Sequence, residues 1–415
     1  GTTGTTGTTG TTGMLAQTTT FPANLHPLFY SLQLDNCMPD STGWENEFPL
    51  EPSLCYLNHA AVAPWPQRTA DAINAFATEN IQQGATHYPR WEVKEKQLRQ
   101  QLKELINAPS VDDIALLKNT SEALSVVAHG LKWQSGDQVI ISDEEFPSNR
   151  IVWESLARYG VEVIEVNLTQ AETPELAIYD ATTTKTRLIS ISSVQYASGL
   201  KVDLNQLGEF CTHNNVLFCV DAIQSIGAVV TDVQACKADF MMADGHKWML
   251  GPEGLALFYC SEKVRDQLKL YQYGWHMIEE AGNYDKKEWE VAASARRFEC
   301  GSPNMLTIHG LSASLSLILE IGMSTIEKSL QQRIDFTIDK LSSSPGIEVL
   351  SPTETDRRAG IVIFKTENSD EASLHRYLMN QRVICAKRGG GIRFSPHFYT
   401  PFPVIERAIE IVLQK

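Results

Sequence analysis

Short apolar runs alternate with helical stretches through the middle of the chain. Seven such runs follow one another between about residues 113 and 260: DIALL, DQVIIS, VEVIEV, TRLISISSV, VLFCVDAI, ADFMMADG and GLALFYC. Strands that are buried on both faces have this apolar character, and the amphipathic segments between the runs have the period of a helix. The pattern therefore predicts an α/β fold in which a mainly parallel sheet is covered by helices.

The pattern changes on both sides of this region. The segment before it is helical in pattern with a break near Gly84, and a long helical stretch is expected after it, over about 305–342. Near the end of the chain, GIEVLSP, AGIVIFKT and GGGIRFSP have the pattern of strands, separated by one helix and followed by another. We therefore expect three structured parts: an N-terminal segment (14–66) that contributes to the small domain and the active site, a large domain (67–325), and a smaller α+β C-terminal domain (326–415).

The first thirteen residues, GTTGTTGTTGTTG, repeat a three-residue unit and offer no side chain able to form a core. Met14 follows them directly. We interpret residues 1–13 as a tag or low-complexity tail and leave them out of the fold prediction.

Composition and charge narrow the class of protein. With 415 residues and 43% hydrophobic content, the chain is the size of a globular enzyme. Its net charge of -15 disfavours nucleic acid or an anionic membrane as partner, because either requires a basic face. The eight cysteines are scattered without a CxxC pair, and no apolar run is long enough for a membrane helix. A protein of the reducing cytoplasm is expected.

One candidate site lies where the run IALL passes into a helix. Asn119 is a plausible N-cap, and Glu122 stands three residues later, the spacing of a capping box. Thr120 and Ser121 would then present hydroxyl and backbone N–H groups at a helix N-terminus, where anions bind readily. The alternative is that these residues only cap the helix.

Two further candidates, Asp221 and Lys247, also follow apolar runs. An acid at the end of a buried strand needs a cation or strong donors, unless Asp221 serves only as the N-cap of a following helix. A lysine that is shielded from water loses its proton more readily and becomes a nucleophile toward carbonyl carbon. The alternative for Lys247 is an ordinary surface position, which the apolar run before it and Trp248 after it disfavour.

Other chemistry finds no support in the sequence. Motifs of phosphate-binding loops, dinucleotide-binding folds, hydrolase elbows and zinc proteases are missing, and the histidines lack the spacing of metal ligands, so no metal is expected. An anion site, a strand-end acid and a strand-end lysine are the groups that pyridoxal 5'-phosphate needs for its phosphate, ring nitrogen and aldehyde.

Seven short segments, in order, carry a family resemblance: YLNHAAVAP, NTSEAL, EFPSNR, VDAIQSIG, DGHKW with GPEG, GSPN and RFSPHFY. Together they resemble the class V aminotransferase family of fold-type I pyridoxal-phosphate enzymes, which includes cysteine desulfurases, kynureninases and isopenicillin-N-epimerase-like proteins. The resemblance covers most of the chain after about residue 50. It implies a large cofactor domain and a smaller C-terminal domain.

The resemblance implies cofactor roles for eight residues. Lys247 would form the Schiff base with pyridoxal phosphate, and Asp221 would keep the ring nitrogen protonated. Gln224, expected at the start of the next helix, would bond the ring hydroxyl, and Phe146 would stack on the ring. The remaining four would contact the phosphate: Thr120, Ser121, His246 and, from the neighbouring subunit of a homodimer, Ser302. Asp244 stands where desulfurases often carry serine, and its role is left open.

Substrate residues are also implied by the resemblance. Arg393 matches the position that binds the substrate α-carboxylate, for which a guanidinium group is well suited. Asn58, His59, Gln195 and Tyr399 are further pocket candidates, with an equally plausible role as loop or packing residues.

The sequence leaves the reaction open. We expect a homodimer that acts on a small amino acid, with transamination as the leading reaction. A desulfurase-like carbon–sulfur lyase, a kynureninase-like lyase and an epimerase are alternatives, as is a protein that binds the cofactor without turnover. Cys385 precedes Arg393 by less than the desulfurase pattern requires and sits in an apolar run, so burial is expected for it rather than catalysis.

Overall fold

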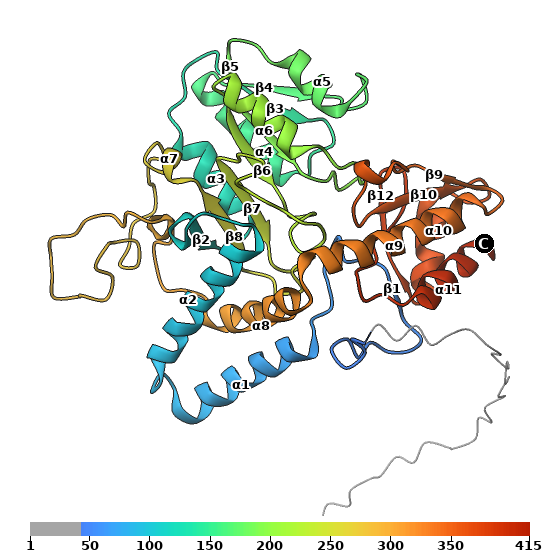
Figure 1. Ribbon diagram of the computed structural model, residues 1–415, viewed down its shortest axis with the longest axis horizontal. Helices are drawn as coiled ribbons and strands as arrows, with labels where there is room; N and C mark the ends of the chain where they lie inside the picture. Colours follow the sequence, from blue (N-terminus) through green and yellow to red (C-terminus); the bar gives the residue numbers. More distant parts are fainter. Residues whose placement is uncertain (1–42) are drawn as a thin grey trace, which may run out of the picture. The chain divides into compact units, whose positions relative to one another are not determined.

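The protein is described by a computed structural model that covers residues 43–415. The repeat at 1–13, and the part of the N-terminal segment up to residue 42, lie outside the described residues. Within the described range, the expected α/β architecture with a mainly parallel sheet is confirmed (Figure 1).

The central sheet has seven strands in the order β2-β8-β7-β6-β5-β3-β4. All seven apolar runs of the sequence form strands. Strand β8 is antiparallel to both of its neighbours, and the other pairs are parallel. The strands are β2 (Ile114–Leu117), β3 (Gln138–Ser142), β4 (Glu162–Val166), β5 (Thr186–Ser192), β6 (Leu217–Asp221), β7 (Phe240–Asp244) and β8 (Ala256–Cys260).

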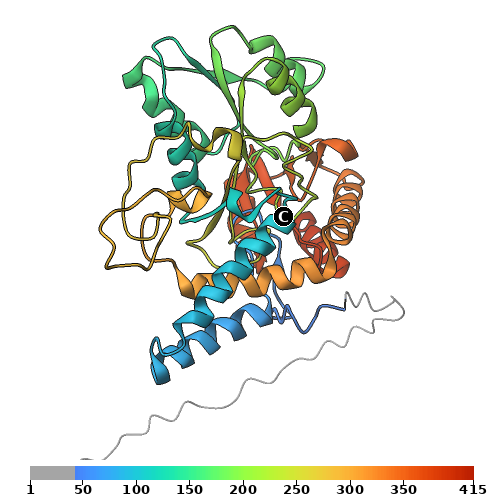
Figure 2. The same cartoon turned by 60° about the vertical axis from the view of Figure 1, so that its left-hand side comes forward.

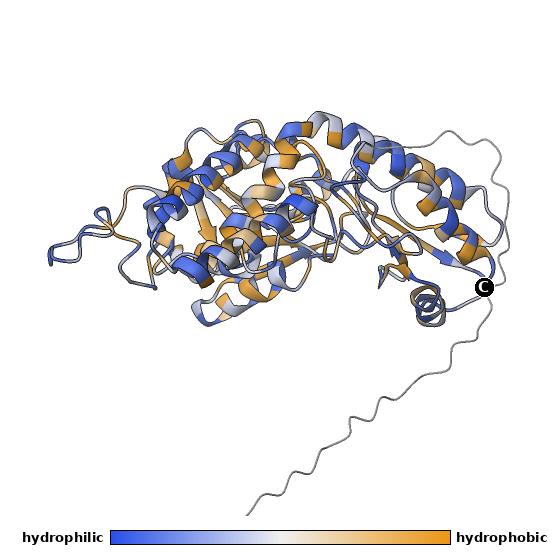
Figure 3. Cartoon of the chain, turned by 90° about the horizontal axis from the view of Figure 1, so that it is seen from below, coloured by the Kyte–Doolittle hydropathy of each residue, from blue (hydrophilic) through white to orange (hydrophobic). Residues whose placement is uncertain are grey.

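Both faces of the sheet are buried because successive side chains point to opposite sides. In β7, Phe240 and Met242 join the hydrophobic cluster of one face, and Met241 and Ala243 join that of the other. Helices α3 (Thr120–Gly130), α4 (Ser148–Glu154) and α7 (Glu262–Arg265) contribute to the first cluster. Helices α2 (Tyr88–Leu105), α5 (Pro174–Ala181), α6 (Leu204–His213) and α8 (Met305–Ile321) cover the other face. Figure 3 shows the hydrophobic strands between helices with hydrophilic outer sides.

Two glycines break the long helical stretches. Helix α1 (Gln67–Gln83) ends at Gly84, where φ is 56°, so the break near this residue is confirmed. The expected helix over 305–342 is in fact two, α8 and α9 (Met323–Ser342), which meet at Gly322 with a bend of 83°. No single helix among the described residues is long and apolar enough to cross a membrane; only α8 and α9 counted together reach that length and composition.

The C-terminal module is built on a four-stranded antiparallel sheet of order β12-β13-β10-β9. Strand β1, from the N-terminal segment, pairs in parallel with β11, so the two ends of the described chain meet in this module. Its elements are β1 (Cys55–Tyr56), β9 (Ile347–Val349), β10 (Val362–Thr366), α10 (Glu371–Asn380), β11 (Val383–Ile384), β12 (Ala386–Arg388), β13 (Gly391–Phe394) and α11 (Phe402–Leu413). Short 3-10 turns occur at Val111–Asp113, Ser155–Tyr159, Ala295–Phe298 and Thr355–Arg357.

Two connections differ from the regular alternation of strand and helix. Between β6 and β7 the chain forms turns, so the helix expected to begin near Gln224 is absent and this prediction is wrong. After α7, residues 266–304 run mostly without helix or strand and project from the domain as a long excursion (Figure 2). Large exposed side chains line it: Tyr271, Tyr273, Tyr284 and Trp289.

Candidate active site

Lys247 lies in the loop that joins the antiparallel strands β7 and β8. Strand β7 is buried along its whole length and ends at Asp244. The loop is held closed by hydrogen bonds from Gly251 N–H to the Gly245 carbonyl (2.7 Å) and from Leu250 N–H to the Lys247 carbonyl (3.1 Å). A buried strand therefore delivers the lysine to the carboxyl edge of the sheet, the edge where α/β proteins bind ligands.

The surroundings of Lys247 favour its uncharged form. Burial lowers its pKa to about 8, and the positive charge of Arg393 adds to this effect. Asp221 and Asp244 act in the opposite direction. The Phe146 ring centroid lies 5.7 Å from the Lys247 Nζ. An amine with a pKa near neutrality is a competent nucleophile and proton acceptor.

Asp221 ends the neighbouring strand β6 and is almost fully buried. Burial and the negative charge of Glu145 together raise its pKa to about 7, although a hydrogen bond from Ile223 N–H (3.1 Å) opposes this rise. No helix follows Asp221, so its alternative role as an N-cap is excluded. A carboxyl group in this state would be stabilised in its charged form by a bound cation, such as a protonated ring nitrogen.

The N-terminus of α3 forms as the sequence predicts. The Asn119 side chain accepts the Glu122 N–H at 2.9 Å, and Glu122 accepts the Lys118 N–H at 2.6 Å. Thr120 is buried, and its hydroxyl has no hydrogen-bond partner among the described residues. Ser121 is more exposed, and its hydroxyl donates to Ser148 at 2.8 Å. The capped helix thus leaves the Thr120 hydroxyl free for an anion.

Asp244 lies beside this helix start. Its Oδ2 accepts the backbone N–H of Thr120 at 3.3 Å, which joins the end of β7 to the beginning of α3. His246, two residues further on, has a buried Nδ1 without a partner among the described residues. Burial raises the pKa of Asp244 and lowers the pKa of His246, and each of the two groups opposes the shift of the other.

A chain of contacts links Lys247 to Arg393. Phe146 packs edge-on against Tyr196, with ring centroids 5.1 Å apart, and the Tyr196 carbonyl accepts a hydrogen bond from Arg393 at 3.0 Å. Arg393 is 2% exposed, and its Nε has no partner. No carboxylate of the described residues forms an ion pair with it. Burial lowers its pKa to about 10, because no nearby carboxylate offsets the loss of hydration of the guanidinium group.

Gln195 and Asn58 also carry unpaired oxygens. The Gln195 amide donates weakly to Glu145 (3.3 Å) and to the Ser192 carbonyl (3.4 Å), but its Oε1 has no partner. The Asn58 Oδ1 is equally unpaired, next to the point where residue 58 bridges to Ser395. Both residues therefore offer acceptors to a ligand.

Gln224 and Trp248 are bound to each other. The Gln224 side chain accepts the Trp248 indole N–H at 2.8 Å and donates to the Ala60 carbonyl at 3.0 Å. Trp248 is fully buried in the core of the C-terminal module, against Gly360. These contacts fix the orientation of the Gln224 amide and use one of its two N–H groups, so the expected bond to a ring hydroxyl stays a prediction.

His59 and Tyr399 lie in an aromatic cluster with Trp248 and His397. The His59 ring nitrogens contact the Ser395 carbonyl (2.9 Å) and the Tyr399 hydroxyl (2.6 Å). The ring is inaccessible to solvent, and burial lowers its pKa to about 4. These contacts favour the packing role of both residues over contact with a substrate.

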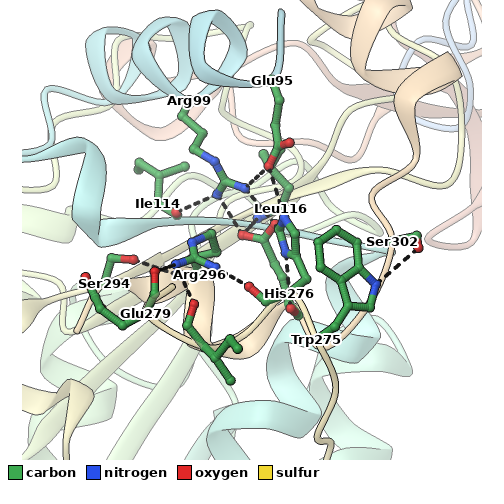
Figure 4. Close-up of polar contacts among 12 residues, drawn as sticks. Glu95, Arg99, Ile114, Leu116, Trp275, His276, Glu279, Ser294, Arg296 and Ser302 are labelled. Carbon is green, nitrogen blue, oxygen red and sulfur yellow. Dashed lines mark hydrogen bonds and ion pairs between the residues drawn. The ribbon is translucent and has the colours of Figure 1, made fainter. Parts of the chain in front are cut away.

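Ser302 is remote from this network. It accepts a long hydrogen bond from the Trp275 indole (3.4 Å) and lines a cavity of about 860 Å³ between α2 and the 266–304 excursion (Figure 4). Its side chain is exposed. The structure therefore offers no contact between Ser302 and the site of its own chain.

Two residues that line this cavity, Glu95 and His276, form with Glu299 a cluster of metal-ligand type, whose ligand atoms lie within 4.8 Å of one another. Arg99 donates to both carboxylates at 2.6 Å, and also to the Ile114 carbonyl at 3.1 Å (Figure 4). The guanidinium group thus already supplies the positive charge that these acids require.

Unpaired polar atoms mark where a ligand would bind. Nine buried side-chain atoms of the described residues lack a hydrogen-bond partner, and five belong to this neighbourhood. They are the Thr120 hydroxyl, the His246 Nδ1, the Arg393 Nε and the oxygens of Asn58 and Gln195. Donors near α3, an acid requiring a cation and a lysine of lowered pKa fit the phosphate, ring nitrogen and aldehyde of pyridoxal phosphate.

Three residues that the sequence analysis did not single out take part in the site. Glu145 is a buried acid that accepts the Ser192 N–H at 2.7 Å and acts on Asp221. Tyr196 connects Phe146 to Arg393, and Trp248, the residue after Lys247, is anchored by its indole N–H to the Gln224 side chain. Glu145 and Tyr196 adjoin Phe146 and Gln195, which were candidates, but no pattern in the sequence predicts their contacts.

Comparison with known proteins identifies the family of the chain. The profile of the family described as Aminotransferase class-V matches residues 55–395. A probable cysteine desulfurase of Methanothermobacter thermautotrophicus is 30% identical over 375 residues, which span 85% of this chain and 92% of that protein.

Solved structures show the same fold. A cysteine desulfurase from Thermococcus onnurineus matches with a TM-score of 0.80 at 21% identity, over 90% of this chain and 97% of its own. A cystine C-S lyase, solved with its product cysteine persulfide, matches with a TM-score of 0.81 at 22% identity, over 88% and 99% of the two chains. The fold is therefore that of the fold-type I enzymes.

Proposed function

The chain belongs to the class V aminotransferase family, and within that family we propose that it is a carbon–sulfur lyase acting on a small sulfur-containing amino acid. Like the family, it is a pyridoxal-phosphate-dependent enzyme. The observation that carries the choice of lyase is the 30% identity to a probable cysteine desulfurase along nearly the whole of that protein. This supports the lyase alternative of the sequence analysis better than transamination.

We assign the cofactor contacts from the geometry of the site. Lys247 would hold the aldehyde carbon, Asp221 the ring nitrogen, and Thr120 with His246 the phosphate, with Phe146 against the ring. When bound, the cofactor withdraws electrons from the substrate Cα and so makes its proton acidic.

Arg393 would then bind the substrate, and Lys247 would accept a proton from it. The unpaired guanidinium group binds the α-carboxylate, which turns the Cα toward the loop of Lys247. The Lys247 amine, whose pKa is lowered to about 8, accepts the Cα proton. The bond from Cβ to sulfur breaks next, and the sulfur leaves with the bonding electron pair.

The sulfur would leave without help from a protein thiol. Cys385 is 3% exposed, and burial raises its pKa to about 12, so the nucleophilic thiolate is scarce. Its burial confirms the expectation from the sequence. With cystine as substrate, the balanced reaction is cystine plus water giving cysteine persulfide, pyruvate and ammonia. With cysteine, sulfide replaces the persulfide.

A product assay tests this proposal. The purified holoenzyme is incubated with cysteine or cystine, and pyruvate, alanine, sulfide, persulfide and pyridoxamine phosphate are quantified. We expect pyruvate with an equal amount of sulfide or persulfide, unchanged in Cys385→Ala. Alanine in place of pyruvate, together with loss of turnover in Cys385→Ala, would show a thiol-dependent desulfurase. Accumulation of pyridoxamine phosphate with a keto acid would show an aminotransferase.

We also propose that the enzyme is a homodimer. The large exposed side chains of the 266–304 excursion, together with the outward position of Ser302, support a second copy on this side of the chain. Sedimentation of the holoenzyme at the mass of two chains is expected, and a monomer with full activity would contradict the proposal.

A further inference from the structure

An acidic side chain stands where the cofactor phosphate would bind. Asp244 is 8% exposed, and its Oδ2 accepts the backbone N–H of Thr120, the first residue of α3. This N–H is one of those that a phosphate at the helix start would use. The buried Thr120 hydroxyl beside it makes no hydrogen bond of good geometry, although it lies close enough to the Asp244 carboxylate to lower the pKa of that group, so a phosphate and Asp244 would compete for the same hydroxyl.

A phosphate at this position would meet a negative charge. The phosphate monoester of the cofactor carries up to two negative charges at neutral pH. Among the described residues, the charged groups that act on Asp244 are His246 and Lys247, both in the loop after β7. Asp244 in turn raises the pKa of Asp221, at the end of β6. Glu253 acts on His246, and Arg393 of β13 acts on Lys247.

His246 is the residue that can relieve this repulsion by taking a proton. Its Nδ1 is buried and unpaired, the negative charge of Asp244 raises its pKa, and its own positive charge lowers the pKa of Asp244. Burial raises the pKa of the Asp244 carboxyl and lowers the pKa of the His246 ring, so burial opposes the charged form of each group. A second anion would raise the pKa of both groups.

We propose that Asp244 and His246 form a proton-accepting pair that couples binding of the cofactor phosphate to uptake of a proton. The pair takes up the proton, on the carboxylate or on the imidazole, when the phosphate binds as a dianion. The affinity for the phosphate therefore falls as the pH rises. This inference rests on the proposed cofactor site but concerns binding alone, so it can fail while the lyase assignment stands.

The experiment uses the full chain stripped of cofactor, with pyridoxamine 5'-phosphate as the probe. This probe carries the ring and the phosphate but no aldehyde, so it forms no bond with Lys247. Titration calorimetry in two buffers with different ionisation enthalpies gives the number of protons taken up per probe bound. Unphosphorylated pyridoxamine serves as the control ligand.

At about pH 8, where the probe's own phosphate is almost fully ionised, we expect the wild type to take up about half to one proton per probe. Asp244→Asn, which keeps an acceptor for the Thr120 N–H but leaves only His246 to accept a proton, should take up less than half of the wild-type amount. At this pH the variant should bind the probe about tenfold or more tightly, the effect of removing one like charge from a buried site. Near pH 6 the two proteins should bind almost equally. Glu410→Gln is the matched control, because it removes an exposed acid on α11 that acts on neither Asp244 nor His246, and it should behave as wild type.

Several outcomes would overturn the proposal. Equal proton uptake in the wild type and in Asp244→Asn would remove Asp244 from the coupling. Weaker binding by the variant at every pH would show that Asp244 only positions Thr120. If Asp244→Asn fails to fold by circular dichroism, Asp244→Ser carries the same comparison with a smaller polar residue. A wild type that binds pyridoxamine but not its phosphate would overturn both the coupling and the phosphate site.

Discussion

The two sides of Lys247 are built in opposite ways. On one side, the next residue, Trp248, packs with His59 and Tyr399 and is bonded to Gln224, and all of these side chains have hydrogen-bond partners. Toward α3 and β13, buried polar atoms stand without partners. The first region contributes to stability, because buried groups are packed and paired. The second costs stability and is explained by a ligand that would complete it.

The largest effect is expected from removing the lysine itself. Lys247→Ala should lower turnover by at least about 10⁴-fold, because both the covalent attachment and the proton acceptor are lost. The visible absorbance of the bound cofactor should disappear with it. Lys269→Ala, which removes an exposed lysine, is the control and should retain wild-type turnover. A coloured Lys247→Ala protein with residual turnover above a hundredth of wild type would refute the assignment.

The bonded side is tested by Trp248→Ala. Trp248 is fully buried, and truncating such a side chain typically lowers the free energy of unfolding by about 3–5 kcal/mol. Urea unfolding of the apoprotein measures this without a contribution from the cofactor. The half-exposed Trp65 provides the control, since Trp65→Ala should change the free energy by less than about 0.5 kcal/mol. Equal losses in the two variants would contradict the anchoring role.

The unpaired side is tested by Arg393→Lys. This change keeps the charge but removes the planar fork that holds a carboxylate, so kcat/KM should fall by about 10²-fold. The free energy of unfolding should fall by only about 1 kcal/mol, because the protein bond that is lost is the one to the Tyr196 carbonyl. Steady-state kinetics and thermal unfolding give the two quantities. Arg388→Lys, at an exposed position on the neighbouring β12, should alter kcat/KM by less than about twofold. A variant that loses stability but not kcat/KM would make Arg393 a structural residue.

The smallest effect concerns the stability of the apoprotein. The pKa of Lys247 is about 8 in the folded chain, against an ordinary value of 10.5. Between these pH values the unfolded state binds more protons than the folded state, so the free energy of unfolding rises with pH. The destabilisation caused by burying the charged lysine is gone above about pH 10.5. Lys247→Met should therefore stabilise the apoprotein at pH 7 by about 1–2 kcal/mol, allowing for partial exposure.

The gain from Lys247→Met should shrink as the pH approaches 10.5. Urea unfolding at pH 7 and at pH 10 checks this, with Lys269→Met as the control for a general effect of removing a positive charge. A gain that is the same at both pH values would mean that packing, and not the charge, explains it.

The sheet could be predicted from the sequence because its signal is local. Each of the seven strands is a short apolar run, and the alternation of its side chains between the two faces needs no knowledge of distant residues. The Asn119 cap could be predicted for the same reason, because its side chain accepts a hydrogen bond from the N–H of Glu122, only three residues away. The turns between β6 and β7 were missed because a helix is the usual connection between parallel strands.

The hydrogen-bond partners of the site residues could not be predicted from the sequence. Gln224 was expected to face the cofactor, but its amide is bonded to Ala60 and Trp248, which are distant in sequence. His59 had two plausible roles, and only the positions of Ser395 and Tyr399 favour packing. In each case the residue type was informative, while its partner depends on how two distant segments meet.

The close approach of Gly360 to Trp248 has a consequence for sequence variation. A β-carbon at position 360 would overlap with the indole ring, and one at Gly227, where φ is 94°, would overlap with the Trp248 carbonyl. Positions 360 and 248 are therefore expected to vary together: a related chain with alanine at 360 should carry a smaller side chain than tryptophan beside its lysine. Gly227 meets the backbone of residue 248, so it should remain glycine whatever that side chain is. The triplet offers a criterion for recognising chains that anchor the catalytic loop in the same way.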